Sequence, residues 1–300
     1  MAAHFISGNY GEEGNPSQTY DYYPGTTPTS PLLIYVHGGA WRFGDKSSFH
    51  RSDNDVHKIR EYFQAAGFAT ATINYRLSHE ALFPAQIHDV KAAIRYLKQH
   101  AKILGFDPAK IALAGGSAGG HLVQLAAAST ALKDPYFEGL PAADIPAHAS
   151  SSVSCAVSIY GVSDLRTIFD DRVACGFDRN HPEDDGAEWR LLGSPYPAPV
   201  GSAAETNWSK AHPIDLVQQA ERSGNRRHAP VFYVHGTGDT CVPPNQSEKA
   251  HRALGGRGVA TELLLVPGAE HADPAIYADR KAWERIVDWV LHQFEGTSRN

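Results

Sequence analysis

Short apolar runs alternate with amphipathic segments along the chain from residue 31 onwards. Each run is nearly continuous in hydrophobicity, which is typical of strands covered on both faces. A pair of antiparallel edge strands is expected around Gln18–Tyr23, ahead of these runs. The apolar runs themselves predict strands at Leu32–Val36, Phe68–Asn74, Ile111–Ala114, Val153–Tyr160, Val231–Val234 and Leu263–Val266.

The segments between these runs carry apolar residues at helical spacing, so that each could bury one face. Because strand and helix take turns, right-handed crossovers should build a mostly parallel sheet with helices on both faces. The pattern therefore predicts an α/β fold made of one domain over residues 1–300. The expected helices are Val56–Ala66, Pro84–His100, Gly120–Ala128, Gln246–Leu254 and Ala278–Phe294.

Two stretches interrupt the alternation, at residues 129–152 and 162–228, and both are expected to be irregular. They are rich in Pro, Gly, Asp and Arg, with isolated aromatic residues. Long irregular segments inside a compact domain are usually functional loops. Since residues 162–228 directly follow a predicted strand, we expect them to form a cap or lid over the strand ends.

Composition narrows the class of function. The formal net charge is −6 at pH 7 and no run is rich in Lys and Arg, which argues against a nucleic-acid partner. No signal-peptide pattern and no apolar run of about 18 residues is present, so we expect no membrane span and a cytoplasmic location, with secretion left open. Cys155, Cys175 and Cys241 are far apart and lack metal-type spacing; reduced thiols are the simplest interpretation, and one disulfide plus one free thiol stays open.

One serine is surrounded by glycines between a predicted strand and a predicted helix. Ser117 is the centre of "GGSAG" at residues 115–119, a G-x-S-x-G pattern. A sharp strand-to-helix turn strains the serine backbone, lifts its hydroxyl out of the sheet and tolerates only small neighbours. The same G-x-S-x-G pattern is also compatible with an ordinary tight turn between a strand and a helix. A nucleophile is therefore predicted only if suitable partners follow.

A serine hydroxyl is a poor nucleophile near neutral pH, so it needs a base and an acid that orients the base. In this fold class the chain order is serine, acid, histidine. Asp239 follows the strand at Val231–Val234, and His271 follows the last strand. Both lie at carboxyl ends of strands, where open α/β sheets assemble their sites. Asp164 also follows a strand and is the alternative acid, but the penultimate strand is where this order places the acid.

The first parallel strand runs into a second glycine-rich segment, "HGGAWRFGDK", at residues 37–46. Backbone N–H groups of this loop and of the residue after the serine can converge on one oxygen. The expected donors of this oxyanion hole are Gly39, Ala40 and Ala118. Trp41 and Tyr75 are candidates for the substrate pocket, although each could equally belong to the core.

Taken together, these motifs resemble the α/β-hydrolase superfamily. Within it, the chain is similar to the hormone-sensitive-lipase-like carboxylesterases and to the BD-FAE group of feruloyl and acetylxylan esterases. The resemblance runs from about Gln18 over nearly the whole chain and includes "YVHGGAWRFGDK", "GFDPAKIALAGGSAGGHL", "PVFYVHGTGDTCVP" and "LLLVPGAEHADP". It implies an α/β-hydrolase fold, with Ser117 as nucleophile, His271 as base and Asp239 as orienting acid, and no metal or organic cofactor. Ala40 replaces the third glycine of the lipase-like loop, which should narrow the pocket by one methyl group.

The resemblance predicts a serine carboxylic-ester hydrolase that acts on small-molecule esters with short-chain or aromatic groups. An arylformamidase acting on N-formylkynurenine is an alternative, because those enzymes also carry an HGG-x-W loop. A prolyl-peptidase-like enzyme would need a gating domain for which this chain has no room. A non-catalytic interaction protein of the same fold is the third alternative, although such relatives characteristically lose a triad member. A homodimer through the last helix or the sheet edge is left open.

Overall fold

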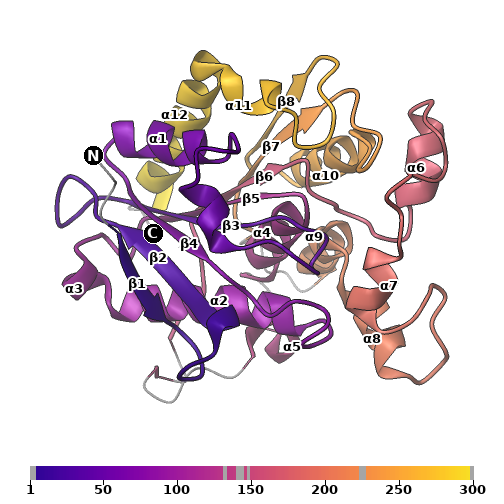
Figure 1. Cartoon of the computed structure of the whole chain (residues 1–300), viewed down its shortest axis with the longest axis horizontal. Coiled ribbons are helices and arrows are strands. Elements are labelled where there is room, and N and C mark those ends of the chain that lie inside the picture. Colours follow the sequence, from indigo (N-terminus) through magenta and orange to yellow (C-terminus); the bar gives the residue numbers. More distant parts are fainter. Residues whose placement is uncertain (1–4, 131–133, 140–144, 147–148, 223–227, 298–300) are drawn as a thin grey trace.

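Eight strands form one sheet in the order β1-β2-β4-β3-β5-β6-β7-β8 (Figure 1). The computed structural model describes residues 5–130, 134–139, 145–146, 149–222 and 228–297. Strands β1 and β2 pair antiparallel at one edge, β2 pairs antiparallel with β4, and the other pairs are parallel. The strands are β1 Ile6–Asn9, β2 Thr19–Tyr23, β3 Leu32–Val36, β4 Ala69–Ile73, β5 Ile111–Gly116, β6 Cys155–Ile159, β7 Val231–Gly236 and β8 Thr261–Val266.

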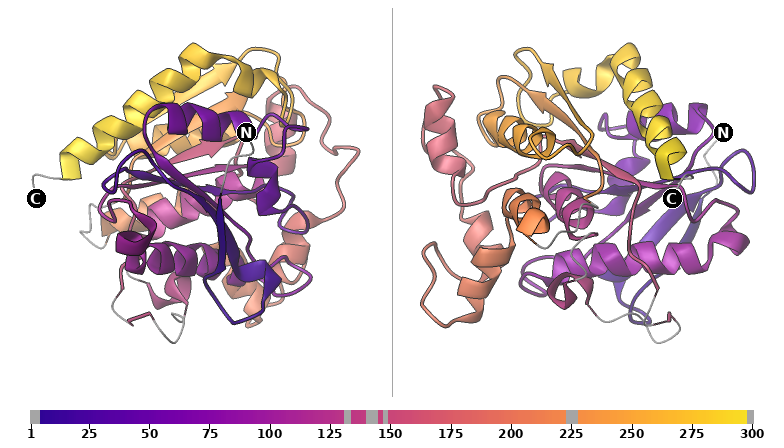
Figure 2. Two further views of the ribbon diagram at one scale, coloured as in Figure 1. Left: turned by 60° about the vertical axis from the view of Figure 1, so that its left-hand side comes forward. Right: turned by 180° about the vertical axis from the view of Figure 1, so that it is seen from behind.

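The sheet is covered by helices on both faces (Figures 1 and 2). Successive strand residues point to opposite faces: Leu32 and Ile34 belong to one apolar cluster, whereas Leu33 and Tyr35 belong to the other. One face packs against α1 His57–Ala65, α11 Ala275–Ala278 and α12 Arg280–Thr297. The opposite face packs against α2 Ala85–Gln99, α4 Ala118–Ser129, α9 Pro213–Arg222 and α10 Asn245–Gly255, with the short α3 Ala101–Leu104 and α5 Pro135–Glu138 nearby.

The pairing register brings the carboxyl ends of the parallel strands together. Val36 of β3 is opposite Gly115 of β5, and Gly116 of β5 is opposite Ile159 of β6. At the other side of the sheet Gly236 of β7 is the partner of Val266 of β8. The loops after β3, β5, β7 and β8 therefore emerge along one rim of the sheet.

The segment at residues 162–228 was expected to be irregular, but its described part, 162–222, contains four helices: α6 Ile168–Ala174, α7 Ala187–Leu192, α8 Ala203–Lys210 and α9. Residues 129–152 likewise contain α5. That expectation was wrong because these helices are short and their apolar positions are too few to show a period. Leu191, Leu192 and Trp208 nevertheless anchor them in the core. Helices α6, α7 and α8 stand together beside the sheet (Figures 1 and 2).

The predicted α/β class and mostly parallel sheet are confirmed, and every predicted strand and helix has a counterpart. The antiparallel edge around Gln18–Tyr23 is also confirmed, with β1 as the second strand of the pair. Cys155, Cys175 and Cys241 are free thiols, as expected. Within the described residues, no helix has both the length and the apolar character needed to cross a bilayer.

Candidate active site

Ser117 occupies the sharp turn between β5 and α4. Its φ of 53° and ψ of −119° lie in a region that a residue with a side chain rarely adopts. Its N–H donates to the carbonyl of Ile159 at 2.9 Å, which fixes the turn against β6. A Cβ at Gly116 would lie 2.9 Å from Oη of Tyr160, and a Cβ at Gly119 would overlap the carbonyl oxygen of Val36. The small residues around Ser117 are therefore required by close packing.

This packing predicts that Gly119→Ala is destabilising. The new methyl group would meet backbone of β3, which cannot move aside as a flexible side chain can. Overpacking of this kind typically costs about 1–3 kcal/mol. Gly255→Ala is the matched control, because it also lies in a helix and its Cβ would meet only Cγ2 of Thr261, at 3.7 Å. Chemical denaturation of both variants should show a lower unfolding free energy for Gly119→Ala alone; equal stabilities would contradict the close approach.

His271 links the serine to an acid. It lies in the loop after β8, and its Nε2 is 2.9 Å from Oγ of Ser117. Its Nδ1 is 2.7 Å from Oδ2 of Asp239, in the loop after β7. The ring of Tyr160 packs against the imidazole at a centroid distance of 4.8 Å and an interplanar angle of 62°. The structure thus brings the three predicted side chains into one hydrogen-bonded row.

Asp239 is fully buried and held on both oxygens. Its Oδ1 accepts from the N–H groups of Cys241 and Val242, at 3.0 and 2.8 Å. Burial pushes the pKa of Asp239 upward, but the imidazoles of His235 and His271 outweigh it and lower that pKa to about 2. The carboxylate is therefore ionised at neutral pH and oriented towards His271.

The alternative acid, Asp164, lies elsewhere. Its carboxylate accepts from Nε and Nη2 of Arg166, both at 2.8 Å. The histidine beside it is His212, whose Nδ1 is 3.3 Å away. Among the described residues, His271 makes no hydrogen bond or ion pair with Asp164. The geometry therefore favours Asp239 as the partner of His271.

The predicted oxyanion loop has an unusual backbone. Gly39, Ala40 and Trp41 all have positive φ, at 114°, 51° and 57°. In the described part of the chain nothing accepts a hydrogen bond from the N–H groups of Gly39, Ala40 or Ala118. Ala40 and Ala118 line the same cavity as Ser117, whereas Gly39 is not among its lining residues. Two of the three residues predicted to supply the donors therefore line the cavity.

Trp41 lines the cavity, and a hydrogen bond to a buried histidine holds its indole in place. Its Nε1 donates to Nδ1 of His121 at 3.2 Å, so the proton of that neutral imidazole is on Nε2, which donates to the carbonyl of Ala211 at 2.7 Å. Burial lowers the pKa of His121 to about 4, which keeps the ring neutral. This chain of hydrogen bonds connects the loop after β3 to the junction of α8 and α9.

Tyr75 does not line the cavity, contrary to its candidacy for the substrate pocket. Only 1% of it is exposed, its hydroxyl donates to the carbonyl of His37 at 3.1 Å, and its ring stacks on the imidazole of His37 at 4.4 Å. Tyr75 therefore supports the loop after β3 from behind. Sequence alone does not show which side of a buried aromatic residue meets the ligand.

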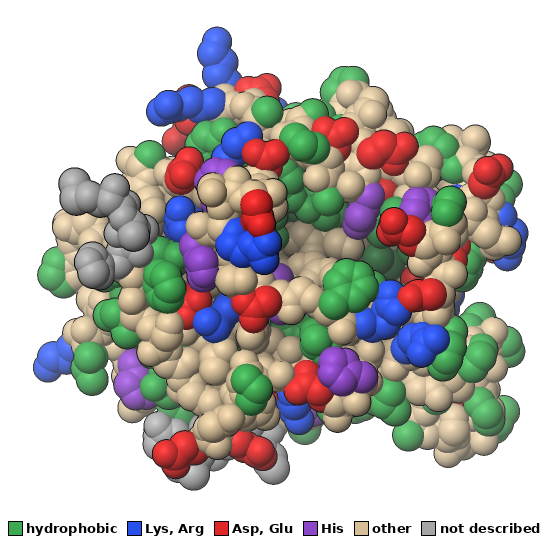
Figure 3. Space-filling model, in the orientation of Figure 1, with side chains coloured by type: hydrophobic (Ala, Val, Ile, Leu, Met, Phe, Trp, Pro, Cys, Tyr) green, Lys and Arg blue, Asp and Glu red, His purple; other side chains and the backbone are tan. Residues whose placement is uncertain are grey.

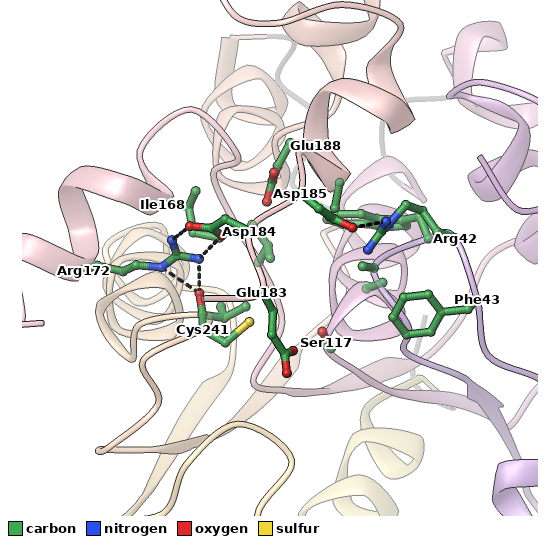
Figure 4. A pocket seen from close by; sticks show the side chains of 16 residues that line it. Arg42, Phe43, Ser117, Ile168, Arg172, Glu183, Asp184, Asp185, Glu188 and Cys241 are labelled. Carbon is green, nitrogen blue, oxygen red and sulfur yellow. Dashed lines mark hydrogen bonds and ion pairs between the residues drawn. The ribbon is translucent and has the colours of Figure 1, made fainter. Parts of the chain in front are cut away.

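The cavity above Ser117 has a volume of about 280 Å³ (Figure 4). Its floor is formed by residues 40–43 and by Ser117 and Ala118, and its far wall comes from the 162–228 segment. On this face acidic and basic side chains surround a central hollow (Figure 3). The thiol of Cys241 also lines the cavity, and burial raises its pKa to about 12, so it is protonated at neutral pH.

Arg172 connects the wall of the cavity to the loop that carries Asp239. Its Nη1 and Nη2 donate to the carboxylate of Asp184 at 2.6 and 3.0 Å, and its Nε and Nη2 donate to the carbonyl of Cys241 at 3.0 and 2.7 Å. A second ion pair, Arg42 with Asp185, joins the loop after β3 to the same wall. Sequence reasoning missed these residues, since only the Asp- and Arg-rich composition of the segment hinted at them.

The family of the chain follows from its relatives. Residues 21–254 match the sequence model of the BD-FAE family. The chain is 31% identical to the probable carboxylic ester hydrolase LipM of Mycobacterium tuberculosis over 264 residues, and 31% identical to esterase LipQ of that organism over 266. These alignments cover 87% of this chain but 50% and 55% of LipM and LipQ, so the chain spans about half the length of these relatives.

Solved structures agree on the fold. A truncated carbohydrate esterase from gut microbiota superposes with a TM-score of 0.79 and 25% identity, over 98% of both chains. Esterase 2 of Thermogutta terrifontis superposes with a TM-score of 0.68 and 22% identity, over 97% of this chain and 96% of the other. The expected α/β-hydrolase fold is confirmed, and the chain belongs to the BD-FAE family.

Proposed function

We propose that this chain is a serine carboxylesterase that hydrolyses short-chain or aromatic esters through an acyl-enzyme. The observation that carries the proposal is the hydrogen-bonded row from Ser117 Oγ through His271 to Asp239. It lies beside a cavity lined by Ala40 and Ala118, whose backbone N–H groups have no acceptor among the described residues. The names of LipM and LipQ, a carboxylic ester hydrolase and an esterase, agree with this chemistry.

Acylation begins when Nε2 of His271 takes the proton of the Ser117 hydroxyl and Oγ attacks the ester carbonyl carbon. Asp239 keeps the proton of the imidazole on Nδ1 and stabilises the imidazolium that forms. The carbonyl oxygen becomes an anion, which the N–H groups of Ala40 and Ala118 can bind, with Gly39 as the third predicted donor. One such donor is typically worth about 3–4 kcal/mol of the barrier.

The tetrahedral intermediate then expels the alcohol, which leaves with the proton that Nε2 of His271 returns. Deacylation repeats the steps with water: His271 takes a proton from water, the hydroxide attacks the acyl carbon, and Ser117 leaves with that proton. Free acid and the starting enzyme are released. Every proton in this cycle passes through one nitrogen, Nε2 of His271.

The arrangement of the chain fits this role. We propose that residues 1–300 form one α/β-hydrolase domain in which the 162–228 segment is the cap, because Arg172 and Asp185 of this segment reach the walls of the cavity. The partner is a small ester that enters between the cap and the loop after β3. Trp41 would contact its acyl group.

A substrate panel tests the reaction class. Purified protein should hydrolyse p-nitrophenyl acetate, p-nitrophenyl butyrate and phenyl acetate, with kcat/KM at least about tenfold above that for N-formylkynurenine, a difference of about 1.4 kcal/mol in barrier. The reverse order would reassign the chain as an arylformamidase. If the protein hydrolyses none of the three esters and does not hydrolyse N-formylkynurenine either, a non-catalytic interaction protein is favoured instead.

A further inference from the structure

Arg172 of α6 is a buried cation whose guanidinium bridges two parts of the site (Figure 4). Only 1% of the residue is exposed. A guanidinium has five N–H groups, and that of Arg172 makes five hydrogen bonds: two to the carbonyl of Cys241, two to the carboxylate of Asp184 and one to the carbonyl of Arg179. Arg172 therefore ties the wall of the cavity to the loop after β7.

The bonds to Cys241 act on the peptide unit that also holds the acid. The carbonyl of Cys241 and the N–H of Val242 belong to the same peptide bond, which is planar and rigid. Nε and Nη2 of Arg172 donate to the oxygen of this unit at 3.0 and 2.7 Å. At its other end, the N–H of Val242 donates to Oδ1 of Asp239 at 2.8 Å. The guanidinium therefore fixes the plane that orients the carboxylate, and its charge polarises the unit and strengthens the bond at the far end.

The remaining bonds of Arg172 hold the wall of the cavity. Asp184 lines the cavity of Ser117 and accepts from Nη1 and Nη2 of Arg172 at 2.6 and 3.0 Å. Oδ2 of Asp184 also accepts from the N–H of His181 at 2.6 Å, and the carbonyl of Arg179 accepts from Nη1 of Arg172 at 3.2 Å. The loop between α6 and α7 is therefore attached to the guanidinium at two points.

Helix α6 itself is fixed by the residue before Arg172. The carboxylate of Asp171 accepts from Nε2 of Gln246 at 2.7 Å and pairs with Lys249, both of which belong to α10. The carbonyl of Asp171 accepts from Nδ2 of Asn245 at 3.2 Å. Because α10 directly follows the loop after β7, α6 is anchored beside that loop independently of the guanidinium. Removing only the guanidinium should therefore leave α6 in place.

We propose that Arg172 is a positioning residue for the reaction at Ser117 and that it couples the loop of the triad acid to the wall of the cavity. Through the Cys241–Val242 peptide unit it keeps the acid oriented towards His271, and through Asp184 it keeps the wall in place beside the substrate. The proposal rests on the proposed esterase function, because it concerns how the triad of that reaction is held. A displacement of about 1 Å at a reacting group can cost on the order of 10²-fold in rate.

Arg172→Ala tests the effect on the acid. Without its two donors the carbonyl of Cys241 is free to turn, so kcat for p-nitrophenyl butyrate should fall at least about tenfold. Arg95→Ala is the matched control, because Arg95 is also buried and its guanidinium also donates to one carboxylate and one backbone carbonyl, both of Glu138. Both variants should have a lower thermal midpoint, since each breaks a buried ion pair. Arg95→Ala should keep kcat per folded molecule within about threefold of wild type.

Chemical rescue separates positioning from a loss of stability. Because Arg172 lines the cavity of Ser117, free guanidinium ion can reach the space that the truncated side chain leaves. Guanidinium chloride at about 50 mM, far below the molar concentrations that unfold proteins, should raise kcat of Arg172→Ala at least about threefold. Urea at the same concentration is planar but uncharged and should not raise it. No gain with guanidinium, or an equal gain with urea, would contradict positioning by the guanidinium.

Asp184→Asn cuts the contact with the wall and leaves the contact with the acid loop. The amide carries no charge, so the wall should loosen while Arg172 keeps its bonds to the carbonyl of Cys241. KM for p-nitrophenyl butyrate should therefore rise at least about threefold, with kcat within about twofold of wild type. The double variant Arg172→Ala/Asp184→Asn has no carboxylate at position 184 and should keep the low kcat of Arg172→Ala. Recovery of kcat in the double variant would assign the loss to an unpaired charge and overturn the positioning role.

Arg172→Lys keeps the test decisive if Arg172→Ala does not fold. Lysine retains the charge but lacks the planar fork that joins a carboxylate to a carbonyl, so kcat should again fall at least about threefold. Wild-type kcat in Arg172→Lys, or equal kcat in folded Arg172→Ala and Arg95→Ala, would overturn the proposal. Absence of hydrolysis by the wild-type protein would refute the proposed function, whereas hydrolysis that the Arg172 variants leave unchanged would refute the positioning role alone.

Discussion

Replacing Ser117 by alanine should abolish ester hydrolysis and leave the fold intact. In a serine hydrolase the loss of the nucleophile lowers kcat on the order of 10⁶-fold, because no other group can form the acyl-enzyme. Ser117 makes its side-chain hydrogen bond with His271, and alanine can occupy the same turn with one atom fewer. The measurement is kcat for p-nitrophenyl acetate, together with circular dichroism and the thermal midpoint.

Ser209→Ala is the matched control for this variant. Ser209 is an exposed serine of α8 whose hydroxyl donates to the carbonyl of Thr206. It should keep wild-type activity, within the small range expected for a surface substitution. Substantial turnover by pure Ser117→Ala would remove Ser117 from its proposed role.

Asp239→Asn should lower kcat on the order of 10⁴-fold, the effect of placing an amide where the imidazole needs a carboxylate. The amide can donate to Nδ1 of His271 and so stabilise the wrong tautomer, and it cannot stabilise the imidazolium. Because the pKa of Asp239 is about 2, the wild-type acid is ionised from about pH 4 upward. A loss should therefore be seen throughout the range from about pH 5 to 9, in which the wild-type carboxylate is charged.

Asp164→Asn is the control that separates the two candidate acids. It weakens the ion pair with Arg166, so the thermal midpoint should fall. Activity per folded molecule should nevertheless stay within about threefold of wild type, because Asp164 makes no contact with His271. A large loss of kcat in Asp164→Asn, with activity kept in Asp239→Asn, would reassign the acid.

Much of the candidate site could be predicted from the sequence, because its parts are tied to strand ends. Ser117, Asp239 and His271 each follow a strand whose apolar run is plain in the sequence, and parallel pairing brings such ends to one rim. Their hydrogen bonds could be expected but not measured from sequence. Their catalytic roles stay predictions until the variants are made.

The helices of the 162–228 segment could not be predicted in the same way. They are short, and contacts of this segment join residues that are distant in the sequence, such as Arg172 with the backbone carbonyl of Cys241 and Asp185 with Arg42. Contacts of this kind produce no periodic pattern of apolar and polar positions that a single sequence could show. The position of Tyr75 could not be predicted either. An aromatic residue close to a loop in the sequence can pack under that loop in the core or line the substrate cavity, and the sequence does not distinguish the two.

The identity of the nucleophile is tested most directly by covalent labelling with diisopropyl fluorophosphate, which phosphorylates activated serine hydroxyls. Intact-mass measurement should show one diisopropylphosphoryl group per chain, gained in step with the loss of esterase activity. Peptide mapping should place that group on Ser117, and the Ser117→Ala protein should remain unlabelled. Inactivation with the label on another residue, or persistent activity with Ser117 fully labelled, would contradict the account.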